Sequence, residues 1–138
     1  MKLIRIIVIA ALLLIIVGGY AYQQFKLETD RFISEDPRVW EPVIAGFEQQ
    51  DLEIPLPRDA ILFIGSSTIR FWDDLSEDMQ PMTALGRGFG GAKIADLAYF
   101  ADRLVKPYRP RAIVVYIGAN DFSDLLGNRV KSLQQGQQ

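Results

Sequence analysis

The apolar positions divide the chain into an N-terminal segment, residues 1–22, and a domain that follows it. Lys2 and Arg5 precede an uninterrupted apolar run from Ile6 to Val17, and the sequence Gly-Gly-Tyr-Ala-Tyr follows the run. This pattern predicts either a membrane anchor with its tyrosines at the interface or a signal peptide cleaved after the small residues. Both interpretations leave the basic start inside the cell. We therefore expect the domain outside the cytoplasm, either membrane-anchored or, after cleavage, secreted or periplasmic.

The rest of the chain divides by composition into three parts. Residues 23–35 are polar and mixed in charge, which is typical of a juxtamembrane stalk. Residues 36–127 alternate apolar segments with turns and form the predicted domain. Residues 128–138 lose periodicity and end in glutamines, so we expect a disordered tail.

Apolar periodicity within residues 36–127 alternates between helix and strand. Asp36 and Pro37 predict a helix start, after which Trp40, Val43, Ile44 and Phe47 share one face. Short apolar runs at 60–64 and 112–117 predict buried parallel strands, and 82–85 predicts a shorter one. Between them, 94–104 carries an apolar stripe opposite charged residues, which predicts an amphipathic helix. This order indicates the α/β class with a parallel sheet.

Three polar or glycine-rich motifs follow the three predicted strands: Gly65-Ser66-Ser67-Thr68, Gly86-Arg87-Gly88-Phe89-Gly90-Gly91, and Gly118-Ala119-Asn120-Asp121. In open α/β sheets the ligand crevice lies beyond the carboxyl ends of the strands, so we expect the motifs to meet. A serine at a helix start has free backbone N–H groups beside it, and an asparagine amide can donate to an oxyanion.

Each motif also has a simpler interpretation. Ser66 or Ser67 can be a helix cap, and Asn120 with Asp121 can be a plain turn. The glycines fit the G-x-G-x-x-G spacing of dinucleotide loops, but no acidic residue ends a strand about 20 residues further on. Ile69 stands where the α/β-hydrolase nucleophile elbow needs glycine, so that elbow is excluded.

Composition removes several classes of function. The 138 residues include 15 basic and 17 acidic side chains without a basic stripe, which gives nucleic-acid binding little support. There is no cysteine and no histidine, so thiolate chemistry and the usual metal ligand and general base are missing. We expect no metal and no cofactor.

Together the motifs resemble the SGNH/GDSL hydrolase family over about residues 36–127. The resemblance implies a flavodoxin-like three-layer α/β/α sandwich and hydrolysis of carboxylic esters, often of acyl lipids or acetylated sugars. It implies Ser67 as the nucleophile, and Ser67 N–H, Gly91 and Asn120 as oxyanion donors. Gly65 and Gly118 support these motifs.

The chain departs from the family pattern at three places. Ser66 replaces the aspartate of the family's name motif, and Gly86 stands where asparagine is usual. The family's last block, Asp-x-x-His, has no counterpart, and Asp121 and Asp124 are weak bases for a serine hydroxyl. We therefore expect an incomplete domain, from a truncated or frame-shifted copy, that is inactive or severely impaired as an esterase. The alternatives are a membrane-anchored binding module that retains the oxyanion pocket, and a nucleotide-binding protein. No oligomeric state follows.

Overall fold

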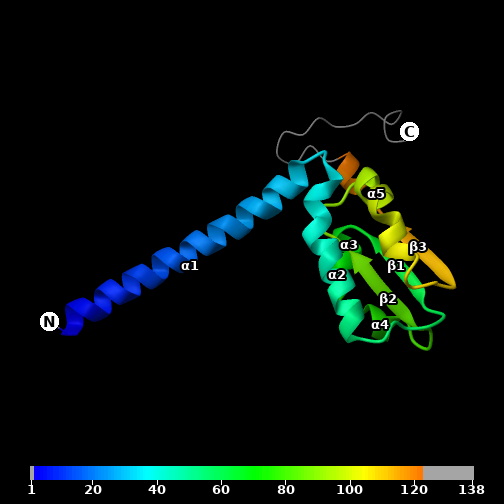
Figure 1. The fold of residues 1–138 in the computed structure, drawn as a ribbon, viewed down its shortest axis with the longest axis horizontal. Helices are drawn as coiled ribbons and strands as arrows, with labels where there is room; N and C mark the ends of the chain where they lie inside the picture. Colours follow the sequence, from blue (N-terminus) through cyan, green and yellow to red (C-terminus); the bar gives the residue numbers. More distant parts are fainter. Residues whose placement is uncertain (1, 123–138) are drawn as a thin grey trace. The chain divides into compact units, whose positions relative to one another are not determined.

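The computed structural model of the protein describes residues 2–122 and divides the chain into two units at the Ile33–Ser34 junction. The first unit is a single helix. The second unit contains a three-stranded sheet and short helices, shown in Figure 1. The tail predicted at 128–138 lies outside the described residues.

Helix α1 (Lys2–Ile33) forms the first unit, and its apolar side chains are exposed along the predicted membrane segment. The stretch Ile4–Ile33 is long and apolar enough to cross a membrane, with a mean hydropathy of 2.5 in its most apolar part. The predicted N-terminal apolar helix is thus confirmed. An anchor and a signal sequence both fit this helix. It also continues through most of the predicted stalk.

The second unit alternates helices and strands in chain order. Its elements, with η for a short 3-10 helix, are η1 (Pro37–Trp40), α2 (Glu41–Glu53), β1 (Ile61–Gly65), α3 (Ser67–Arg70), α4 (Leu75–Asp78), β2 (Ala84–Gly88), α5 (Ile94–Val105), β3 (Ala112–Tyr116) and η2 (Ala119–Asp121). The strands form one parallel sheet in the order β2-β1-β3, so β1 is central. The α/β class predicted from the alternation is confirmed.

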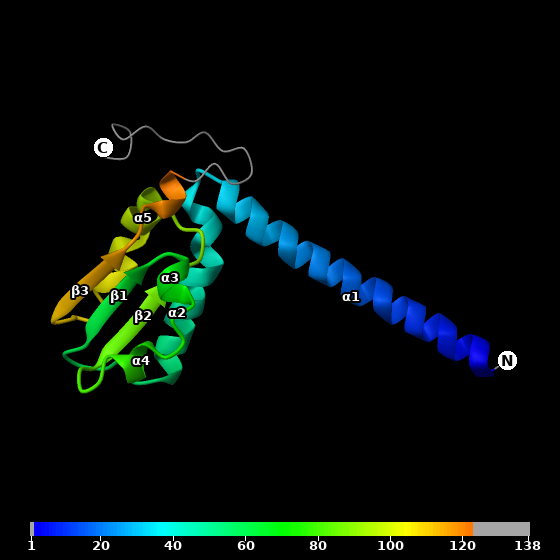
Figure 2. The same cartoon turned by 180° about the vertical axis from the view of Figure 1, so that it is seen from behind.

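Side chains of β1 alternate between two apolar clusters, one on each face of the sheet. Leu62 and Ile64 belong to a core that includes Trp40, Phe89 and Phe100. On the other face, Phe63 packs with Ile69 of α3 and Leu75 of α4. Figure 2 shows the sheet with α2 and α5 on the side away from α3. The helical face predicted from Trp40, Val43, Ile44 and Phe47 is confirmed, because the first cluster contains Trp40 and Ile44, and Val43 and Phe47 pack against it.

Strand β2 differs from its prediction because the glycine-rich motif is partly sheet. Gly86, Arg87 and Gly88 lie inside β2 rather than in a turn, paired with Phe63, Ile64 and Gly65 of β1. Glycine suits the last position of β2, because a Cβ on Gly88 would lie 2.3 Å from the backbone nitrogen of Arg70. The motif is therefore not the strand-to-helix turn that a dinucleotide loop requires.

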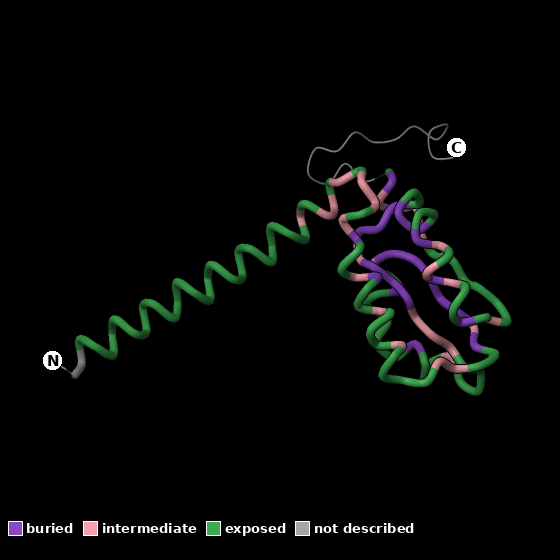
Figure 3. The backbone as a smooth tube through the Cα atoms, viewed as in Figure 1, coloured by how far each residue is buried: buried purple, intermediate pink, exposed green. Residues whose placement is uncertain are grey.

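Strand β3 was predicted to be buried, and this is wrong. It pairs with β1 on one side, has no strand on its other side among the described residues, and all five of its residues are exposed. Figure 3 shows the buried positions gathered around the central strand and the adjoining helices. The sequence pattern cannot distinguish a central strand from an apolar edge strand, because burial depends on the neighbours.

Three further sequence predictions need correction. The apolar residues that follow Ser67 predict one helix, but this stretch forms two short helices, α3 and α4. Pro55 and Pro57 predict a loop over residues 51–59, but α2 continues to Glu53. The apolar spacing places Ile94 on the apolar face of α5 and Asp96 on its polar face, but Ile94 is exposed and Asp96 is buried.

Candidate active site

The first motif places Ser67 at the start of α3, directly after β1. Gly65 allows the strands to approach, because a Cβ there would lie 2.1 Å from the carbonyl oxygen of Tyr116. Ser66 is buried and occupies the N-cap position of α3, as one interpretation predicts, but its side chain makes no capping hydrogen bond. Ser67 is partly exposed, and its side chain makes no hydrogen bond with the described residues. As the first helical residue, Ser67 has no helical acceptor for its N–H.

Backbone contacts join the first motif to the other two. Phe89 N–H donates to the carbonyl of Gly65 at 3.0 Å, which links the first and second motifs. Ser66 N–H donates to the carbonyl of Tyr116 at 3.2 Å, at the end of the strand that precedes the third motif. The three motifs therefore meet at one edge of the sheet, as their positions after the strands predict.

Side-chain contacts join the second and third motifs. Asn120 Nδ2 donates to the carbonyl of Ala92 at 2.9 Å, and Ile94 N–H donates to Asp121 Oδ2 at 3.0 Å. Gly91 adopts a φ of 87°, a conformation that glycine takes without strain. The turn at Gly91 is thus held from its carboxyl side by two residues of the third motif.

The connection after Gly91 has a further polar contact that the sequence interpretation missed. Lys93 N–H donates to Asp96 Oδ2 at 2.8 Å, which caps the start of α5. The spacing of three residues between a helix cap and an acidic side chain is the signal that predicts such a contact. Burial raises the pKa of Asp96, and the Lys93 backbone N–H partly offsets this increase.

Trp40 and Asp121 also affect the pKa of Asp96. The indole N–H of Trp40 has no hydrogen-bond partner of good geometry among the described residues. It nevertheless lies close enough to the Asp96 carboxylate to lower the pKa of that group, against the increase from burial. The nearby Asp121 charge raises the pKa of Asp96, so two carboxylates share this part of the domain.

The motifs account for the predicted site residues as follows. Ser67, Gly91 and Asn120 lie on the three loops that meet, and beside them Gly65 is a position of close backbone approach. Gly118 has a φ of 115°, which favours glycine. The amide of Asn120 has two N–H groups, and the contact with Ala92 uses one of them.

The described residues do not supply a base to Ser67. The carboxylate of Asp121 is buried and accepts from the Ile94 N–H. Asp124 lies outside the described residues. No group of three or more His, Cys, Asp or Glu side chains that could hold a metal occurs within residues 2–122. Within residues 2–122 the site therefore presents a hydroxyl and backbone donors, with no side chain hydrogen-bonded to that hydroxyl.

A separate cavity of about 540 Å³ opens at the opposite edge of the sheet, beside Arg58, Asp59 and Arg109. None of the three motifs contributes to its lining.

Comparison of the chain with protein-family models, with curated proteins and with solved structures found no match. The assignment of a function to this site therefore relies on the motifs and their geometry.

Proposed function

We propose that the chain carries the nucleophile and oxyanion portion of an SGNH/GDSL-type serine ester hydrolase, in a flavodoxin-like α/β/α arrangement. The observation that supports this most directly is the meeting of three motifs, in the family's order, at the carboxyl edge of a parallel sheet. In this proposal Ser67 Oγ attacks the ester carbonyl. The N–H groups of Ser67, Gly91 and Asn120 stabilise the oxyanion.

The reaction needs a general base, which is usually histidine, and the 138 residues contain no histidine. When Oγ bonds to the carbonyl carbon, its proton must pass to a base before the alcohol leaves. Without a base, Ser67 keeps its proton, and the residual catalysis comes from the oxyanion donors and binding alone. We therefore propose that this chain is by itself inactive or severely impaired.

An added base tests the proposal. The full chain in detergent is incubated with p-nitrophenyl acetate and 2-methylimidazole, whose methyl group hinders direct attack on the ester. We expect an acetyl group on the peptide that contains Ser67, formed only when the base is present. Ser67→Ala should abolish this adduct. Thr68→Ala is a matched control at the next, exposed position and should retain it.

The missing histidine also favours a second candidate, a membrane-anchored binding module that keeps the oxyanion pocket without turnover. Methylphosphonate, a tetrahedral anion, is the probe for this function. A folded chain that binds methylphosphonate but never acetylates Ser67 would support the binding module and contradict the hydrolase. A chain that does neither would contradict both.

A further inference from the structure

Each of the three motifs is followed, within four residues, by a large apolar side chain that remains exposed. These side chains are Phe71 after the first motif, Ile94 after the second and Phe122 after the third, with exposed fractions of 68%, 40% and 39%. Exposed apolar residues are ordinary when they occur singly. Their repetition beside every motif of one edge indicates a surface that meets something apolar.

Contacts within the motifs place these residues near one another. A Cβ on Gly118 would lie 3.8 Å from Cδ1 of Ile94. The Ile94 N–H donates a hydrogen bond to the carboxylate of Asp121, which directly precedes Phe122. On the other side of the edge, the Arg70 guanidinium lies over the Phe71 ring at 5.3 Å. Arg70 also lies against the second motif, because a Cβ on Gly90 would come within 2.9 Å of its guanidinium nitrogen.

The chain enters the second unit at this same edge. Lys93 Nζ donates to the carbonyl of Ser34 at 2.8 Å and to Glu35 Oε1 at 2.9 Å. Ser34 is the first residue after α1, and Lys93 is two residues after Gly91. Both views of the ribbon show the segment after α1 beside η2 (Figures 1 and 2).

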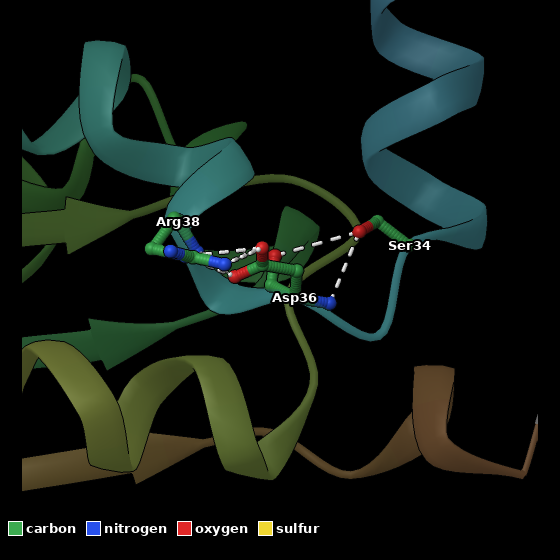
Figure 4. A network of polar contacts seen from close by, with 3 residues as sticks. All are labelled: Ser34, Asp36 and Arg38. Carbon is green, nitrogen blue, oxygen red and sulfur yellow. Dashed lines mark hydrogen bonds and ion pairs between the residues drawn. The ribbon is translucent and has the colours of Figure 1, made fainter.

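A compact polar network fixes this entry segment. The Asp36 N–H donates to Ser34 Oγ at 3.0 Å, and the Arg38 guanidinium donates to both carboxylate oxygens of Asp36 (Figure 4). Arg38 holds the pKa of Asp36 below its usual value, through the side-chain and backbone hydrogen bonds. The entry point is therefore an ordered part of the edge that carries the motifs.

The length of α1 limits how far this edge can lie from a membrane. The apolar part of α1 ends near Tyr22, and the polar residues 23–33 that follow span about 16 Å as a helix. If α1 is retained as an anchor, Ser34 stays within about that distance of the hydrocarbon, and the motifs share its edge.

We propose that the carboxyl edge of the sheet docks on the surface of the membrane that holds α1, with Phe71, Ile94 and Phe122 inserted among the lipids. Such insertion is how amphipathic surfaces bind a bilayer. Combined with the proposed hydrolase, which this last step requires, docking makes an acyl ester of a membrane lipid the substrate class. The docking itself does not depend on hydrolysis.

Charge indicates that a zwitterionic surface is sufficient. The basic side chains at this edge are engaged: Lys93 and Arg38 form the contacts above, and Arg70 also has an interaction within the protein. Among residues 2–122, no cluster of unpaired basic groups at this edge is therefore available for anionic lipids.

Single-cysteine reporters test the docking, because the chain has no native cysteine. Phe71→Cys, Ile94→Cys and Phe122→Cys carry an NBD fluorophore in the full chain reconstituted in phosphatidylcholine vesicles. Leu52→Cys is the matched control: this apolar residue is 82% exposed in the last turn of α2, at the opposite edge. We expect blue-shifted emission and quenching by doxyl-labelled lipid at the three edge positions, and neither at position 52.

Equal solvent exposure of all four labels overturns the proposal, and so does equal quenching of all four. A signal that appears only with phosphatidylserine in the vesicles overturns the apolar mode of docking. Circular dichroism of each variant shows whether the fold is retained, and these exposed sites should tolerate cysteine. Because acetylation of Ser67 uses a soluble ester, failure of docking leaves the hydrolase proposal standing, and the reverse also holds.

Discussion

The Asn120 side chain donates a hydrogen bond to the carbonyl of Ala92 at 2.9 Å, across 28 residues of sequence. This contact ties the loop after β3 to the loop after β2. The neighbouring Asp121 strengthens the tie through the Ile94 N–H. Donors that are held in place before a ligand arrives need no reorganisation when charge develops, which is the property that an oxyanion site needs. Asn120 and Asp121, which in sequence resemble a plain turn, therefore form a clamp: their two hydrogen bonds hold the loop after β2.

Loss of this clamp should loosen the second motif. Asn120→Ala removes the donor and leaves the Ala92 carbonyl unpaired, so we expect a loss of about 1–3 kcal/mol in unfolding free energy. Amide hydrogen exchange at residues 91–94 should become faster. Chemical denaturation and exchange mass spectrometry measure the two effects. Unchanged exchange at these residues would show that the clamp does not hold the turn.

Gly65 should be intolerant of any side chain. Gly65→Ala places a Cβ 2.1 Å from the Tyr116 carbonyl oxygen, within the β1–β3 pairing, so the strands must separate. We expect a loss of at least ~3 kcal/mol, as for severe overpacking. Gly46→Ala in α2 is the control, because nothing lies within 4 Å of a Cβ there. It should stabilise the domain by roughly 0.5–1 kcal/mol. Similar melting temperatures for the two variants would contradict the close approach.

A buried polar network holds Arg87, the residue before the last in β2. Arg87 donates to Asp51 and, at 2.7 Å from Nε, to the hydroxyl of Tyr108, which itself donates to Asp51. Burial, together with the hydrogen bond to Asp51, raises the pKa of Tyr108 to about 12. Asp51→Asn leaves the largely buried guanidinium without its carboxylate, and we expect a loss of roughly 3 kcal/mol. Asp59→Asn, at an exposed position, should change stability by less than about 0.5 kcal/mol.

The raised pKa of Asp96 predicts a defined pH dependence. Because the folded state holds the proton more tightly than the unfolded state, the penalty for burying this carboxylate is fully present above the folded pKa. The penalty disappears as the pH falls toward the unfolded value of about 3.8. Asp96→Asn removes the charge and keeps an acceptor for the Lys93 N–H. Its stability relative to the native chain should be highest near pH 7 and decline toward pH 4. Melting curves of both proteins over this range would contradict the prediction if the difference stays constant.

The outer edge of β3, which pairs with no strand among residues 2–122, should promote self-association. Val115 is 53% exposed on a strand without charge or proline, and such edges pair with other strands. Val115→Lys should reduce aggregation of the full chain in detergent, measured by sedimentation velocity. Leu52→Lys, a substitution on an exposed helical position, is the control and should leave aggregation unchanged. The reverse ranking would assign the association to another surface.

Much of the local structure could be predicted because short-range physics decides it. The apolar run at the N-terminus predicts α1 whatever follows, and the apolar spacing from Trp40 to Phe47 predicts the buried face of α2. The alternation of strands and helices predicts a parallel sheet, and parallel strands bring their carboxyl ends to one edge. The convergence of the three motifs follows from this alone.

Tertiary structure decided what depends on neighbours distant in sequence. The burial of Asp96 and the exposure of β3 are set by the elements packed beside them, which no local pattern contains. Gly86 to Gly88 became strand because β1 offered partners for their backbone groups, although glycine by itself favours a turn. The sequence by itself determined which residues stand after each strand. Only the folded domain made Asn120 and Asp121 hold the turn at Gly91, because their hydrogen-bond partners lie on another loop.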